Sequence, residues 1–131
     1  VMHGSSSVPQ EWLAIINKHG GDIPETYGVP VEQICEGIKH GVRKINIDTD
    51  LRLASTGTIR QFLAKNPTAF DPRAYLKETI AAMKDIAVAR YEAFGTAGNA
   101  PKIVPLGLDV MTHQYSSARL NSSLGPSYAC A

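Results

Sequence analysis

Residues 42–47 carry the clearest alternating pattern of the chain. Lys44 and Asn46 fall on one face, and Ile45 and Ile47 fall on the other, which is the two-residue period of a strand. The face with Lys44 and Asn46 suits a hydrophobic core poorly, because a buried polar group without a partner costs about 1–3 kcal/mol. Spacing alone leaves two interpretations equally open: this face lines a polar site, or the segment is an edge strand with one solvated face.

Apolar residues at helical spacing predict most of the other elements. After a strand end at residues 1–4, helices are expected at residues 9–19, 30–40, 50–65, 71–94 and 108–115. Thr49 or Asp50 is expected to cap the third helix, and Asp71 the fourth. The fourth helix is the longest, and its apolar residues recur every three or four positions, which indicates a packing face. They are Leu76, Ile80, Met83, Ala87, Tyr91 and Phe94.

The order of these elements predicts an α/β fold. Strand, helices, strand, helices is a βαβα order, which gives parallel strands with helices packed outside them. A (β/α)₈ barrel takes about 250 residues, so this chain of 131 would supply the last portion of one. The chain opens at Val1 within what reads as a strand already under way, and we expect a missing N-terminal part. The barrel portion is expected at residues 1–115, and an irregular, poorly ordered tail at the serine-rich residues 116–131.

Composition narrows the classes of partner. A net charge of +1 without a dense run of Lys and Arg favours neither nucleic acid nor an anionic membrane. No apolar run approaches the roughly 18 residues that span a bilayer. Cys35 lies at helical spacing among apolar residues and Cys130 lies next to the end, so a disulfide framework is not expected. These features predict a soluble, cytoplasmic protein.

The two expected strand ends carry groups that suit a phosphate. Gly4-Ser5-Ser6 precedes a helix and offers amides, hydroxyls and the positive end of a helix dipole. Asp48-Thr49-Asp50 offers a similar set after the second strand. Each serine or threonine taken singly is more often an ordinary helix cap. Their pairing across successive strands favours a phosphate site, because working residues of (β/α)₈ barrels lie at the carboxyl ends of strands.

His3 stands at the first strand end beside Gly4. From there its imidazole could bind Zn²⁺ or move a proton, although a hydrogen-bonded structural histidine is the more common case. One imidazole does not make a zinc site, since a catalytic site needs three protein ligands and an open position.

Several motifs resemble the class II fructose-1,6-bisphosphate aldolases, in particular their Calvin-cycle-like subgroup. The similar segments are residues 3–11, 24–30, 41–52 and 70–73, followed by the long helix to Gly98 and the chain to about Tyr115. The resemblance implies a (β/α)₈ barrel, of which this chain would be the C-terminal part with the seventh and eighth strands. Residues 116–131 do not follow the family pattern.

The resemblance also implies roles for single residues. His3 corresponds to the last of three zinc-binding histidines, and Asn46 to the residue that holds the ketose skeleton near the metal. The groups that bind the phosphate of the dihydroxyacetone phosphate half correspond to Gly4, Ser6, Asp48 and Thr49. Arg52 and Arg73 correspond to arginines associated with the other phosphate, one of which reaches into a neighbouring subunit.

The implied reaction is zinc-dependent aldol cleavage of fructose 1,6-bisphosphate to dihydroxyacetone phosphate and glyceraldehyde 3-phosphate. Zinc would stabilise the enediolate as a Lewis acid, so no lysine Schiff base is needed. Lys44 is instead expected to pair with a buried acid in the missing barrel. The other zinc ligands and the proton-transferring Asp would precede Val1, so the isolated chain is expected to be inactive. The complete enzyme is expected to be a homo-oligomer, a dimer or a tetramer.

Two other interpretations stay open. Tagatose 1,6-bisphosphate aldolases use a related site and differ in the stereochemistry of the sugar, although residues 24–30 favour the fructose bisphosphate enzymes. A chain that persists without the rest of the barrel would instead be a non-catalytic phosphate-binding piece.

Overall fold

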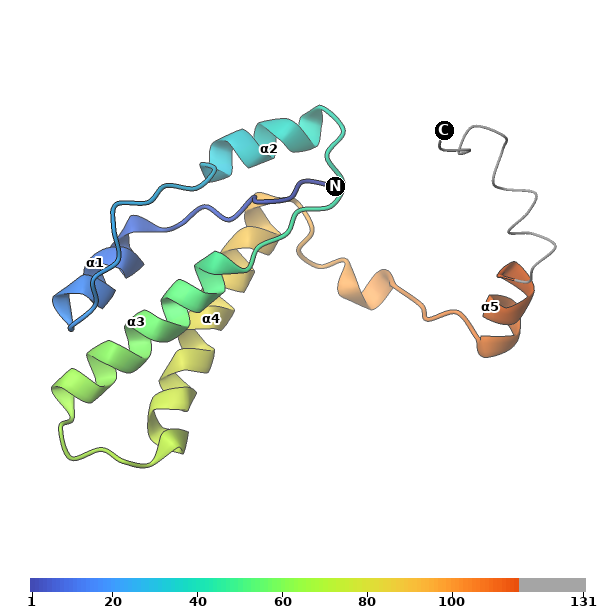
Figure 1. Ribbon diagram of the computed structural model, residues 1–131. Coiled ribbons are helices and arrows are strands. Elements are labelled where there is room, and N and C mark those ends of the chain that lie inside the picture. Colours follow the sequence, from blue (N-terminus) through green and yellow to red (C-terminus); the bar gives the residue numbers. More distant parts are fainter. Residues whose placement is uncertain (116–131) are drawn as a thin grey trace, which may run out of the picture. The chain divides into compact units, whose positions relative to one another are not determined.

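The computed structural model of the protein describes residues 1–115, and these residues are mainly helical (Figure 1). Contacts divide the chain between Ala97 and Gly98. The expected tail at residues 116–131 lies outside the described residues, and the assignment of residues 1–115 to one barrel portion stays a prediction. In order, the elements are α1 (Gln10–Lys18), α2 (Val31–Lys39), α3 (Thr49–Lys65), α4 (Pro72–Ala93), the 3₁₀ helix η1 (Ala100–Lys102) and α5 (Leu108–Gln114).

The two expected strands meet at a single point. Met2 and Ile45 form an isolated parallel bridge, in which the Met2 amide donates to Lys44 O at 2.7 Å and the Asn46 amide donates to Met2 O at 3.3 Å. Within residues 1–115 the pairing extends no further into named strands. The parallel direction agrees with the sequence, whereas the predicted strand length is wrong, because two short segments without further neighbours make no stable sheet.

Helix starts follow the sequence closely at α4 and less closely at α3. Asp71 caps α4, since its Oδ1 accepts the Arg73 amide at 3.0 Å, and Pro72 takes the first helical position. The cap position of α3 is Asp48 rather than Thr49 or Asp50. Asp50 lies inside the first turn and is fully buried, so its carboxylate has another use.

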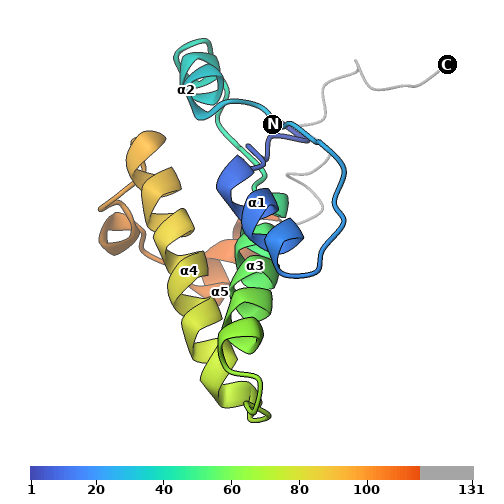
Figure 2. The same ribbon diagram turned by 90° about the vertical axis from the view of Figure 1, so that its left-hand side faces the viewer.

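The core of residues 1–97 lies where α1 packs on α3. Helix α4 packs on another side of α3 (Figure 2). Four buried residues form the centre of this core, with Trp12 and Ile23 packed against them. The four are Val8, Leu13, Ile16 and Leu53. Phe62 of α3 and Tyr75 of α4 add an edge-to-face ring contact at 6.4 Å.

The apolar stripe predicted as the packing face of α4 is only partly covered, with three of its six residues exposed and three half-buried. Ile80 is 68% exposed and Tyr91 59% exposed, whereas Thr79 and Ile86 are buried. That prediction is wrong for the exposed half of the stripe, because the buried positions of α4, Thr79 and Ile86, lie beside the stripe and not on it. Within the same range, no helix combines the length and the apolar character that crossing a membrane requires.

Candidate functional site

Asn46 and His3 come together where the two chain segments form their bridge. Lys44 Nζ lies 2.6 Å from Asn46 Oδ1, and the Asn46 Nδ2 lies 3.0 Å from His3 Nδ1. A lysine ammonium only donates, so it fixes which end of the Asn46 amide is the oxygen. The Asn46 nitrogen then donates to His3 Nδ1, and a neutral His3 carries its proton on Nε2.

The Ser5 side chain hydrogen-bonds to both of these chain segments. It is fully buried, and its Oγ lies 2.7 Å from Asn46 O and 3.1 Å from Met2 O. The same oxygen accepts the Asn46 amide at 3.1 Å. One hydroxyl therefore fixes the backbone of Asn46 and that of Met2, which precedes His3, a role that the sequence did not indicate.

Ser6 connects the first segment to the start of α3. Its Oγ accepts the amides of Asp48 at 3.2 Å and Thr49 at 3.1 Å. Three of the predicted phosphate ligands are thus brought into one cluster, at the positive end of the α3 dipole. A phosphate bound here would compete with the Ser6 oxygen for two amides. The Asp48 carboxylate points to Arg52, whose Nε lies 2.9 Å from Asp48 Oδ2.

Gly4 and the loop after α1 shape the surroundings of Ser6. Gly4 has a φ of +63°, which a side chain would strain, and it is exposed. The Val29 amide donates to Ser6 O at 3.1 Å, and a Cβ at Gly28 would overlap that carbonyl. Residues 24–30, which carry part of the family resemblance, therefore support the serine loop directly.

Asp50 holds the other side of that loop from inside the protein. Its Oδ1 accepts the Val8 amide at 2.9 Å, and its Oδ2 accepts Ser7 Oγ at 2.7 Å and Arg90 Nη2 at 3.1 Å. Arg90 Nη2 also donates to Ser7 Oγ at 2.7 Å. Sequence reasoning missed Arg90, because it lies 40 positions from its carboxylate and the chain pattern gives no signal of that contact.

The two predicted arginines occupy different places. Arg52 lies in the first turn of α3 beside Asp48, within the cluster. Arg73 lies in the first turn of α4, and since α3 and α4 form an antiparallel hairpin, it belongs to the opposite end of that hairpin (Figure 1). Its guanidinium and backbone amide bind Asp71 and lower the pKa of that carboxyl, and the carboxylate in turn raises the pKa of Arg73.

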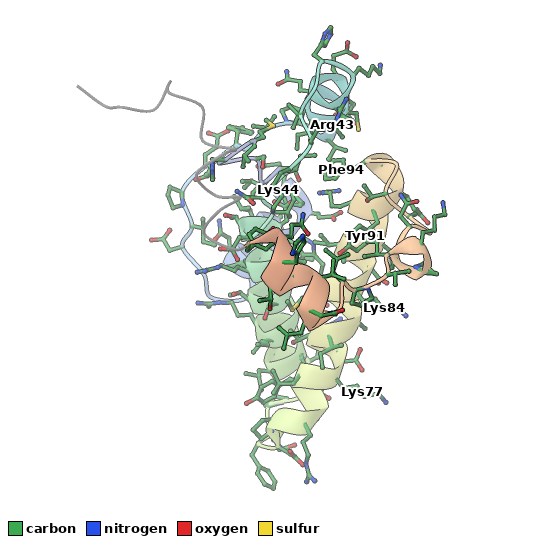
Figure 3. The ribbon with its side chains drawn as sticks, turned by 90° about the vertical axis from the view of Figure 1, so that its right-hand side faces the viewer. Arg43, Lys44, Lys77, Lys84, Tyr91 and Phe94 are labelled. Atoms are coloured by element: carbon green, nitrogen blue, oxygen red, sulfur yellow. The ribbon has the colours of Figure 1, made fainter. Side chains whose placement is uncertain are left out.

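A cavity of about 530 Å³ lies between residues 43–48 and the C-terminal half of α4. Figure 3 shows Tyr91 and Phe94 of α4 on the side of the helix toward Arg43 and Lys44. Met2 pairs with one edge of residues 43–48, through Lys44 O and the Asn46 amide. The amide and carbonyl of Ile45 therefore point to the opposite edge, which is free. No other main chain among residues 1–115 pairs with it.

The comparison with known families decides what this arrangement is part of. Residues 1–99 match the sequence model of a family described as fructose-bisphosphate aldolase class-II. The chain belongs to the class II fructose-bisphosphate aldolases. The resemblance inferred from the motifs is thereby confirmed at the level of this family.

Curated relatives of this aldolase chain agree with the family match. A fructose-bisphosphate aldolase of Stutzerimonas stutzeri is 70% identical over 124 residues, which are 95% of this chain and 35% of the relative. One of Pseudomonas aeruginosa is 69% identical over 121 residues, 92% of this chain and 34% of that protein. A class 2 enzyme of Synechocystis sp. is 57% identical over 129 residues, 98% of this chain and 36% of that protein. This chain therefore spans about a third of the length of these aldolases.

His3 is the residue of this chain that is predicted to bind a metal. Within residues 1–115, no group of three or more His, Cys, Asp and Glu residues is placed to hold a metal ion. The His3 imidazole is exposed, so zinc could reach it, but zinc at Nδ1 would displace the Asn46 amide and zinc at Nε2 would require the ring proton to move to Nδ1. The donor set of residues 1–115 therefore includes one predicted zinc ligand and does not fit a complete site.

Proposed function

We propose that the complete protein catalyses the reversible, zinc-dependent cleavage of fructose 1,6-bisphosphate to dihydroxyacetone phosphate and glyceraldehyde 3-phosphate. One observation carries the proposal: the parallel bridge joins the two segment ends, so that His3 and Asn46 share a hydrogen bond beside the Ser6 cluster. That arrangement occurs in a chain of the class II aldolase family. The enzyme is cytoplasmic in this proposal.

The chain is proposed to be the C-terminal part of a (β/α)₈ barrel, with residues 1–4 and 42–47 in its last two strands. The parallel direction of the Met2–Ile45 bridge supports this, because successive barrel strands run parallel. The free edge at Ile45 supports it too, since a closed barrel leaves no strand edge unpaired. The cavity beside that edge offers room for a further strand.

Asn46 is proposed to hold the ketose beside the metal. When bound, zinc supplies a Lewis acid that polarises the ketose carbonyl. His3 would be one of its ligands, and the others would come from the part of the protein outside this chain. An amide nitrogen carries two hydrogens, and zinc bound to His3 would leave no free lone pair on His3 Nδ1, so both hydrogens would become available to substrate oxygens. Lys44 keeps the amide in that orientation.

Phosphate binding is proposed at two places. Gly4, Ser6, Asp48 and Thr49 would hold the phosphate of the dihydroxyacetone half through backbone amides and the Ser6 hydroxyl. Arg52 and Arg73 would hold the other phosphate. Arg52 lies in the Asp48 cluster, whereas Arg73 lies at the opposite end of the α3–α4 hairpin. That separation favours Arg73 as the arginine offered to a neighbouring copy, and hence a dimer or tetramer.

The names of the relatives favour fructose bisphosphate over tagatose bisphosphate as the substrate. A non-catalytic phosphate-binding piece remains the proposal for the 131-residue chain on its own. The reason is that residues 1–115 hold no group of three or more His, Cys, Asp and Glu residues placed to bind a metal, whereas zinc catalysis needs three protein ligands.

A chimera tests the catalytic proposal. The present chain would replace the matching third of the Stutzerimonas stutzeri relative, and cleavage of fructose 1,6-bisphosphate would be followed with added zinc. We expect activity in the chimera and loss of that activity on chelation with EDTA. In His3→Ala we expect loss of turnover and a weaker affinity for zinc. His19→Ala is the matched control, because His19 closes α1 away from the bridge. Full turnover by His3→Ala would reject the assignment of His3 as a ligand.

A further inference from the structure

We propose that Arg90 and Asp50 are positioning residues for residues 4–8, which we call the phosphate loop. The inference rests on the proposed function, in which Gly4 and Ser6 of this loop bind a substrate phosphate. Neither residue touches the phosphate cluster itself. Asp50 contacts the loop through the Ser7 hydroxyl and the Val8 amide, and Arg90 contacts it through the Ser7 hydroxyl.

The first support is the completeness of the contacts around the Asp50 carboxylate. Asp50 is 0% exposed and the Arg90 side chain is 17% exposed, so the pair is shielded from water. One carboxylate oxygen accepts the Val8 amide, and the other accepts both the Ser7 hydroxyl and the Arg90 guanidinium. A buried carboxylate is retained in a fold only when it is paired and hydrogen-bonded, and here the pairing group comes from α4.

The second support is the backbone of Val8. Its φ is +52°, and a β-branched residue with positive φ is a genuine outlier. Such a conformation persists only where the surroundings impose it. Asp50 imposes it from one side through the Val8 amide, and the core cluster holds the Val8 side chain from the other, at 7% exposure.

The third support is that Asp50 and the amides that contact Ser6 lie in the same first turn of α3. The Ser6 hydroxyl accepts the amides of Asp48 and Thr49, and Asp50 follows them directly. The loop therefore contacts the start of α3 through three consecutive residues, Ser6, Ser7 and Val8. Arg90 fixes the orientation of the carboxylate and so sets where Ser6 stands against those amides. α4 thereby reaches the phosphate cluster without contributing a ligand to it.

Kinetics of the chimera test the effect on the substrate. In Arg90→Gln we expect the KM for fructose 1,6-bisphosphate and the inhibition constant for dihydroxyacetone phosphate to rise at least about tenfold, with a smaller change in kcat. Arg90→Lys should restore most of the loss, because a single Arg90 nitrogen, Nη2, makes both contacts and an ammonium can replace it. Arg60→Gln is the matched control, since Arg60 Nη1 donates to His19 O at 3.3 Å far from the loop.

Hydrogen exchange in the 131-residue chain tests the clamp without any activity. The Val8 amide should exchange at least about tenfold faster in Arg90→Gln than in the parent chain, relative to the Leu13 amide. Arg60→Gln should leave that ratio unchanged. Equal Val8 exchange in Arg90→Gln and the parent overturns the clamp. Equal KM values in an active chimera overturn its role for the substrate. An inactive parent chimera overturns the proposed function instead, and the exchange ratio still decides whether Arg90 holds the loop.

Discussion

Two aspartate–arginine pairs of this chain use the same groups with opposite consequences. Asp71 and Arg73 are two positions apart, 39% and 91% exposed, with 2.6 Å between Oδ2 and Nη2. Asp50 and Arg90 are 40 positions apart, 0% and 17% exposed, with 3.1 Å between the corresponding atoms. The shorter contact, between Asp71 and Arg73, lies within the N-terminal cap of α4. The longer one joins the phosphate loop, α3 and α4.

The difference teaches that distance alone does not rank ion pairs. An exposed pair is screened by water and typically contributes about 0–1 kcal/mol. A buried pair has lost its hydration, so removing one partner leaves an uncompensated charge and costs about 3–5 kcal/mol. What the pair holds matters as much as its strength, and Asp50 holds a strained backbone.

Removal of the buried carboxylate should have the largest effect. We expect Asp50→Ala to lower the free energy of unfolding of the 131-residue chain by about 3–5 kcal/mol, because Arg90 is left without its anion and the Val8 amide without its acceptor. Urea denaturation followed by circular dichroism measures the change. Asp48→Ala, in an exposed pair at the start of the same helix, should change the value by less than about 1 kcal/mol. Similar losses in both variants would contradict the ranking.

The sequence predicted the local member of this comparison and missed the distant one. Asp71-Pro72 is a start signal within two residues, and the structure confirms the cap. Asp50 was interpreted as a cap because its neighbours are typical of a helix start, but the cap position is Asp48. The contact of Asp50 with Arg90 depends on how α4 folds back on α3, which no pattern within either helix encodes.

The same limit applied to packing and to the site. Helical periodicity located α4, but it assigned the burial to a stripe that holds Ile80 and Tyr91, both exposed. Periodicity reports which residues share a face, and the neighbours decide which face is covered. Family motifs identified His3, Asn46 and Ser6, which the structure brings close together. The motifs gave no sign of Ser5, whose hydroxyl locks both segments, since a small serine in a loop is ordinary in any sequence.

A double-mutant cycle should separate the two pairs directly. We expect the coupling energy of Asp50→Ala with Arg90→Ala to be about 2–3 kcal/mol, because the two side chains share a buried network. The cycle of Asp71→Ala with Arg73→Ala should give a much smaller coupling energy, since both groups remain hydrated when separated. Unfolding free energies of the parent and the six variants supply both values. Equal coupling energies would remove the distinction between the pairs.

The smallest effect is expected from acid at the exposed pair. The pKa of Asp71 is lowered, first by the Arg73 side chain and then by the Arg73 amide. A depressed folded-state pKa means that the contribution to stability is present above the ordinary carboxyl pKa of about 3.9 and is lost as the pH falls through the lower folded value. NMR titration of the Asp71 carboxyl should therefore give a midpoint below that of a free aspartate, and Arg73→Gln should move it upward. Because the pair is exposed, added salt should reduce the difference between parent and variant. If neither Arg73→Gln nor added salt changed the titration midpoint of Asp71, the hydrogen bond from the Arg73 amide alone would set this pKa.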